Sequence, residues 1–237
     1  MTHPADAFGD ALLDHLRGGT GAHVLERDDG FVETFSGVDT YFASPDSFAP
    51  VESAALGLLN GNVLDIGAGA GRFSLAAQAL GHPVTALDDS LGAVEVCRER
   101  GVADVVHSSF HVFEPDVGYD TFLMMGNNLG LLAPDPVRSL QRIRSMSNPG
   151  ARIVGTTLDP YATDDPAHLA YHQANRRRGR YGGHVVLRVR RRNVIGPWFD
   201  YLYFSEAELA EIETRAGWAL DVIGREDGRY LAALTMS

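Results

Sequence analysis

An acidic residue and three glycines stand close together in the segment VLDIGAGAGRFSL, residues 63–75. Asp65 ends a short apolar run of strand type, and a helical pattern begins after the glycines, which are Gly67, Gly69 and Gly71. In α/β proteins this arrangement binds nucleotides at the carboxyl ends of strands, because glycine lets the backbone approach a ligand closely. A dinucleotide fingerprint starting at Gly67 would need a small residue at position 72, where the chain has Arg72. NAD and FAD therefore fit this loop poorly.

A pair of acidic residues follows one strand and helix later. The run VTAL predicts a strand that ends at Asp88 and Asp89. A carboxylate at this place can accept hydrogen bonds from both hydroxyls of a ribose. We interpret Asp88 as the residue that binds the ribose and expect Asp89 to line the adenine side of the site.

The pattern D-x-G-x-G-x-G, followed by an acid on the next strand, resembles class I S-adenosylmethionine-dependent methyltransferases, and the resemblance runs from about Tyr41 to the C-terminus. It implies that S-adenosyl-L-methionine is the cofactor. It also implies that the loop binds this cofactor through Asp65, Gly67, Ala68, Gly69 and Gly71. The cofactor carries a sulfonium and an ammonium in place of a pyrophosphate, so a carboxylate near the loop favours it electrostatically.

The same resemblance assigns five further residues in three segments. Ser109 and Phe110 follow the third strand, where the family contacts adenine, and are expected to do so here by stacking or backbone contacts. Asn127 and Asn128 follow the fourth strand, where the family holds the methionine moiety and faces the substrate. The alternative for both asparagines is a loop that satisfies its own backbone. Tyr41 resembles a cap region that closes over the cofactor.

Alternating strand and helix patterns from Val63 onward predict parallel βαβ units. We expect a doubly wound α/β fold with a mostly parallel seven-stranded sheet, an N-terminal helical cap over residues 1–50 and a methyltransferase domain over residues 51–237. An insertion or lid over residues 159–204 should contain a β-hairpin with its turn near residues 195–197. Ser205 with Glu208 predicts a capping box, and Gly217 the end of that helix.

Composition excludes several classes of protein. The 237 residues are 45% apolar and carry a net charge of −11, which disfavours nucleic acid and anionic membranes as partners. The chain has no lysine, so lysine Schiff bases and GK[ST] phosphate loops are excluded. Its lone Cys97 has no neighbours at metal-ligand spacing, and we expect no metal. No membrane span or leader pattern is present in the sequence, so we expect a cytoplasmic protein.

Methyl transfer from a sulfonium is an in-line displacement, so a base is needed only when the acceptor must lose a proton. On the catalytic side we place His172 and His184 of the insertion, together with Asn128. Other candidate bases are His111, Asp159 and Tyr161. A structural or exposed role is the alternative for each of them.

Two arginine clusters, residues 176–180 and 188–192, lie within the insertion. They predict either a solvated, ion-paired surface or, if the strand face of Arg188 and Arg190 points into the active cleft, a site for a carboxylate or phosphate of the substrate. The hairpin that carries the second cluster could also be a dimer edge or a lid, and a homodimer is possible.

The favoured function is methylation of an O, N or activated C atom of a small molecule, as in secondary metabolism. The alternatives are an RNA or protein methyltransferase that uses the arginines, a non-catalytic module that binds the cofactor, and an NAD-linked oxidoreductase with a degenerate loop.

Overall fold

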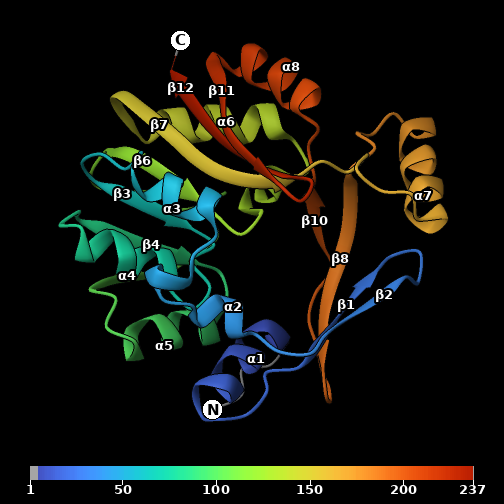
Figure 1. The fold of residues 1–237 in the computed structure, drawn as a ribbon, viewed down its shortest axis with the longest axis horizontal. Helices are drawn as coiled ribbons and strands as arrows, with labels where there is room; N and C mark the ends of the chain where they lie inside the picture. The colour runs from blue at the N-terminus through green and yellow to red at the C-terminus, as the bar shows by residue number, and fades with distance from the viewer. Residues whose placement is uncertain (1–4, 237) are drawn as a thin grey trace. The chain divides into compact units, whose positions relative to one another are not determined.

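The computed structural model describes residues 5–236 (Figure 1). These residues divide into two compact units. Unit 1 contains the described residues up to Phe48 with Asn62–Phe113 and Val186–Phe199, and unit 2 contains Ala49–Gly61, Glu114–Val185 and the residues from Asp200 onward. The predicted boundary between residues 50 and 51 stays a prediction.

The main sheet has seven strands in the order β11-β12-β7-β6-β3-β4-β5. Their bounds are β3 (Val63–Ile66), β4 (Val84–Asp88), β5 (Asp104–His107), β6 (Tyr119–Met124), β7 (Ser147–Leu158), β11 (Trp218–Glu226) and β12 (Arg229–Met236). The pairs β3/β4, β4/β5 and β6/β7 are parallel, whereas β12 runs antiparallel to both β7 and β11. Every residue of β3 is buried, as expected for a strand covered on both faces. The predicted doubly wound fold class is confirmed.

In unit 1, α4 (Arg72–Ala79) follows β3 and α5 (Leu91–Glu99) follows β4, as the sequence predicts. The N-terminal helix α1 (Ala7–Leu16) precedes all strands. The Asp6 carboxylate accepts hydrogen bonds from the amides of Gly9 and Gly92 at the first turns of α1 and α5. A Cβ on Gly92 would lie 2.5 Å from the Cα of Gly9, so the two helices cross where neither has a side chain.

The N-terminal segment differs in part from the helical cap that we expected. It contains α1, but β1 (His23–Arg27) and β2 (Val32–Phe35) follow as an antiparallel hairpin, before α2 (Asp39–Phe42) and the 3₁₀ turn η1 (Pro45–Ser47). Strand β1 also pairs with β8 (His184–Arg191), in a second sheet of order β10-β8-β1-β2 with β9 beside β8. Because β8 is far from β1 in the sequence, no local pattern predicts that the two strands pair.

The hairpin of the insertion turns earlier than predicted. Arg192, at φ 51°, and Asn193 connect β8 to the short β9 (Val194–Ile195), whereas the expected turn at residues 195–197 only separates β9 from β10 (Phe199–Leu202). The prediction placed the turn by Gly196 and Pro197. The structure places it where two polar residues can leave the ladder.

Unit 2 holds the remaining helices: α3 (Pro50–Leu56), η2 (Asn128–Leu132), α6 (Pro136–Ser145), α7 (Pro166–Arg177) and α8 (Glu206–Ala216). The capping box of Ser205 and Glu208 begins α8, and Gly217 ends it in the left-handed conformation, so both predictions are confirmed. No described helix is long and apolar enough to cross a bilayer.

Candidate cofactor site

The glycine loop of unit 1 follows β3 and adopts a backbone that glycine alone enters without strain. Gly67, Gly69 and Gly71 have φ values of 72°, 58° and 75°. Both the Gly67 and the Ala68 amides donate hydrogen bonds to the Leu87 carbonyl of β4, at 2.8 and 3.2 Å. A Cβ on Gly71 would lie 2.8 Å from Val102 Cγ2 and 3.0 Å from Cys97 Sγ. The loop is therefore held against β4 and α5 as bare backbone.

Asp65 is buried beneath this loop, with 3% of its surface exposed. Its Oδ2 accepts a hydrogen bond from the Ser74 hydroxyl of α4 at 2.6 Å. Burial raises the pKa of the Asp65 carboxyl from 3.8 to about 6. The bond to Ser74 shows that Asp65 ties the end of β3 to the helix after the loop. Its predicted role toward the cofactor stays a prediction.

Asp88 lies at the carboxyl end of β4 and faces the glycine loop. Its Oδ2 accepts a hydrogen bond from the Gly69 amide at 2.8 Å, and its Oδ1 accepts one from the Ser90 amide at 2.9 Å. Burial raises the pKa of this carboxyl from 3.8 to about 7. A carboxylate has about four lone-pair positions, so two remain for further donors. The structure thus brings the predicted ribose anchor onto the loop, whereas the neighbouring Asp89 is exposed.

Tyr41 of α2 lies over the same loop, where a Cβ on Gly69 would be 3.4 Å from Tyr41 Cδ1. Arg100, which follows α5, holds this arrangement together. Its guanidinium donates hydrogen bonds to the carbonyls of Tyr41, Phe42 and Ala70, and stands 4.9 Å from the centre of the Phe42 ring. We did not predict Arg100, because nothing in the segment RERG distinguishes it from a solvated arginine at the end of a helix.

Ser109 and Phe110 follow β5, beside the end of β4. The Ser108 amide donates to the Asp88 carbonyl at 3.0 Å, and the ring of His107 is hydrogen-bonded to the Asp89 carbonyl at 2.9 Å. The Phe110 ring is buried, with its centre 4.0 Å from that of the exposed His111. Their contact with adenine stays a prediction.

In unit 2, the loop after β6 holds Asn127 in the left-handed conformation, at φ 69°. The Asn127 amide donates to Thr156 Oγ1 at 3.0 Å, and its carbonyl accepts from the Tyr201 hydroxyl at 2.6 Å. The buried side-chain Oδ1 of Asn127 has no hydrogen-bond partner within residues 5–236. An acceptor left in this state suits a ligand that donates hydrogen bonds. A Cβ on Gly130 would lie 2.3 Å from the Tyr201 ring, so Tyr201 packs on this loop, a role that we did not predict.

Comparison with known proteins bears on the glycine loop directly. Residues 63–150, from β3 into β7, match a family described as a methyltransferase domain. A comparison with curated proteins gives no match. Residues 63–150 thus carry a methyltransferase domain.

Solved structures share the fold of this methyltransferase. A SAM-dependent methyltransferase from Bacteroides fragilis, in complex with S-adenosyl-L-homocysteine, is 24% identical over 100% of this chain and 98% of its own, with a TM-score of 0.83. The 1,6-didemethyltoxoflavin-N1-methyltransferase of Burkholderia thailandensis is 20% identical over 79% and 78%, with a TM-score of 0.53. The glycopeptide N-methyltransferase MtfA is 16% identical over 83% and 91%, with a TM-score of 0.57.

The three residues predicted on the catalytic side of the methyltransferase have different surroundings. His184 Nε2 lies 2.6 Å from Asp200 Oδ1. Asp200 and Tyr201 are successive residues of β10 and point to opposite faces of that strand, so His184 lies across the strand from the Asn127 loop. His172 is buried against the edge of the Tyr161 ring, with ring centres 5.7 Å apart. Asn128 begins η2, and its amide donates to the Met125 carbonyl at 3.3 Å. Their catalytic roles stay predictions.

The arginines of β8 are paired with acidic residues. Arg188 and Arg190 both contact the Glu26 carboxylate at 2.9 Å, and Arg191 binds Asp10 and Asp14 of α1. The arginines of β8 therefore form an ion-paired surface, the first of the two alternatives that the sequence left open. The Glu26 carboxylate already occupies the face of Arg188 and Arg190 that could have bound an anionic substrate.

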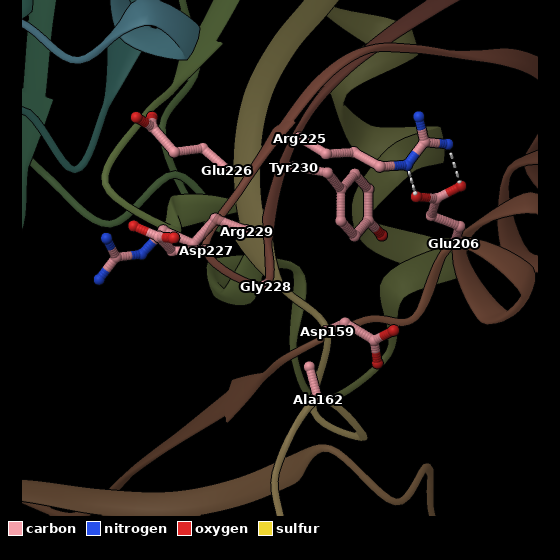
Figure 2. A pocket seen from close by; sticks show the side chains of 9 residues that line it. All are labelled: Asp159, Ala162, Glu206, Arg225, Glu226, Asp227, Gly228, Arg229 and Tyr230. Carbon is pink, nitrogen blue, oxygen red and sulfur yellow. Dashed lines mark hydrogen bonds and ion pairs between the residues drawn. The ribbon is translucent and has the colours of Figure 1, made fainter.

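A surface cavity of about 270 Å³ lies at the β11–β12 turn of unit 2 (Figure 2). Arg225 and Glu206 face each other within it and form two hydrogen bonds of 2.6 and 2.7 Å. Of the candidate bases only Asp159 lines this cavity, and the ion pair of Arg225 with Glu206 is already satisfied. No cluster of three or more metal-binding side chains occurs in the described part of the chain.

Proposed function

We propose that this methyltransferase binds S-adenosyl-L-methionine in unit 1 and methylates a small molecule. The observation that carries the proposal is the placement of Asp88, whose carboxylate meets the Gly69 amide at the end of β4. A ribose binds such a group through its two hydroxyls, and the cofactor approaches a loop that has no side chains at its glycines.

The residues present fit this cofactor. Asp88 keeps two acceptor positions after its bonds to Gly69 and Ser90. The bound cofactor supplies an electrophilic methyl group on a sulfonium, and the protein contributes alignment and exclusion of water.

Two observations support a small acceptor over RNA. Glu26, Asp10 and Asp14 neutralise the arginines that could have formed a phosphate-binding face. Two proteins of the same fold are an N1-methyltransferase of 1,6-didemethyltoxoflavin and an N-methyltransferase of a glycopeptide. Location in the cytoplasm and assembly as a homodimer stay predictions.

Calorimetry with S-adenosylhomocysteine tests the cofactor site, with NADH as the competing ligand. The wild type should bind S-adenosylhomocysteine and not NADH. Asp88→Asn should weaken this binding at least about tenfold, since a hydrogen bond to a charged group contributes about 1.5–3 kcal/mol. Asp104→Asn is the matched control, because that exposed carboxylate lies on β5 and accepts only from Thr85 Oγ1 in the described structure.

The proposal fails if S-adenosylhomocysteine does not bind, or if Asp88→Asn binds it as tightly as Asp104→Asn does. Transfer of label from methyl-tritiated S-adenosylmethionine then distinguishes the acceptors. Labelled small molecules would support the proposal. Label in RNA or protein alone would show that the acceptor is a macromolecule and not a small molecule.

A further inference from the structure

His23 is a buried histidine at the first position of β1, and the predicted catalytic residues do not include it. Only 5% of its surface is exposed. Its ring stacks on the Phe35 ring of β2, with centres 5.2 Å apart and planes 3° from parallel. Its orientation is therefore fixed by the hairpin that the sequence did not predict.

The hydrogen bonding of His23 determines where its proton lies. Nδ1 is 3.0 Å from the Gly21 carbonyl oxygen, which can only accept, so Nδ1 carries the hydrogen. Nε2 then has a free lone pair, and no hydrogen-bond partner contacts it within residues 5–236. This is the arrangement of a base whose tautomer is set by its other nitrogen.

The surroundings keep this imidazole neutral. Burial lowers the pKa of His23, and the Arg191 guanidinium of β8 lowers it further, while the bond to Gly21 opposes both effects. Arg191 is itself paired with Asp10 and Asp14 of α1, which are the charged groups that face this corner from the helix. At neutral pH His23 can therefore accept a proton.

Two aromatic rings connect His23 to the glycine loop within unit 1. Phe8 of α1 contacts the His23 ring edge-on, with centres 6.5 Å apart, and the Tyr41 ring, with centres 5.3 Å apart. Both Phe8 and Tyr41 lie within 4 Å of the position that a Cβ on Gly69 would occupy. A continuous row of aromatic side chains therefore runs from the glycine loop to the His23 ring.

We propose that His23 is the general base of the methyl transfer and that the acceptor carries an O–H or N–H proton. This inference rests on the proposed function. His23 Nε2 takes the proton from the acceptor as the acceptor's lone pair forms a bond to the methyl carbon. The bond between that carbon and the sulfur breaks, its electron pair stays on the sulfur, and the imidazolium then releases the proton to water. His184 is less suited to this step, because its Nε2 already faces the Asp200 carboxylate.

His23→Asn tests the role without removing the hydrogen bond that positions the side chain, because an asparagine Nδ2 can still donate to the Gly21 carbonyl. The control is His82→Gln, which lies before β4, at the end of that strand opposite Asp88. Both variants are assayed for folding by urea titration and for S-adenosylhomocysteine binding by calorimetry. Methyl transfer is measured with tritiated S-adenosylmethionine and a panel of catechol, phenol, aniline and benzylamine.

We expect His23→Asn to bind S-adenosylhomocysteine as the wild type does and to lose about 10²- to 10⁴-fold in kcat. The acid limb of the wild-type kcat profile should disappear in the variant. Nitrogen-15 NMR of the wild type should show His23 protonated at Nδ1 and bare at Nε2. His82→Gln should retain the wild-type kcat.

Three results would overturn the role of His23: full kcat in His23→Asn, a proton on Nε2 of the neutral ring, or no transfer to any hydroxyl or amine of the panel by an enzyme that binds S-adenosylhomocysteine. Failure to bind S-adenosylhomocysteine at all would instead refute the proposed function on which the inference rests. The binding and transfer measurements therefore separate the two failures.

Discussion

Gly71→Ala perturbs the glycine loop at a position where the structure allows the cost to be worked out. At φ 75°, the left-handed conformation costs an alanine about 1–2 kcal/mol of folding free energy relative to glycine. Its Cβ would also lie 2.8 Å from Val102 Cγ2 and 3.0 Å from Cys97 Sγ. Overpacking of a buried site adds about 1–3 kcal/mol. We therefore expect the free energy of unfolding to fall by about 2–5 kcal/mol.

Gly81→Ala is the matched control. Gly81 has φ 90°, but apart from its two chain neighbours no described residue comes within 4 Å of its Cβ position, so only the backbone cost of about 1–2 kcal/mol applies. Loss of glycine also restricts the unfolded chain in both variants, and this effect cancels in the comparison. Urea titrations with fitted midpoints and slopes give the two free energies.

The contact with Val102 makes a second comparison possible. In a Val102→Ala background, the Gly71→Ala substitution should cost less than in the wild type, because the nearest methyl group is gone. The steric argument would be refuted if Gly71→Ala were no more destabilising than Gly81→Ala, or if its cost were the same in both backgrounds.

Two further predictions concern the residues around this loop. The pKa of Asp88 is raised to about 7, and ribose hydroxyls donate to the charged carboxylate, so S-adenosylhomocysteine affinity should rise from pH 5.5 to pH 8, by at most about tenfold per pH unit. Calorimetry should show this rise in the wild type and a flatter profile in Asp88→Asn. Arg100→Ala removes the bonds to the carbonyls of Tyr41, Phe42 and Ala70, so it should cost about 1–3 kcal/mol of stability and weaken S-adenosylhomocysteine binding. Arg98→Ala, which loses one exposed bond to the Val105 carbonyl, should do neither, and equal effects of the two variants would contradict the assigned role of Arg100.

The sequence predicted the core of unit 1 because its signals are local. An apolar run that ends in Asp65, a glycine loop and a helix lie within a few residues of one another. The sequence also placed Asp88 at the end of the next strand, and the structure adds its contact with the Gly69 amide, since the carboxyl ends of neighbouring parallel strands meet at one edge of a sheet. The capping box predicted the start of α8 because its hydrogen bonds join Ser205 and Glu208, which are only three residues apart.

Predictions were incomplete where the interacting residues are far apart in the chain. Glu26 and Arg188, 162 residues apart, meet because β1 pairs with β8, and the sequence of either strand is compatible with other partners. Because of the same strand pairing, Arg188 and Arg190 form ion pairs with Glu26 and are not left to bind a substrate. Tyr201 and Arg100 do not belong to any sequence motif. Only the tertiary structure shows that their side chains donate hydrogen bonds to the carbonyls of Asn127 and Tyr41.

The sequence by itself therefore determined the fold class, the methyltransferase domain and the acid at the end of β4, because periodicity and short motifs encode them within single βα units. Tertiary structure alone decided which histidine keeps a bare nitrogen. His184 faces Asp200, whereas His23 is bonded through Nδ1 to Gly21 and packed beside Phe8. The lone pair of an imidazole depends on which acceptor its other nitrogen meets, and that acceptor is supplied by the folded chain.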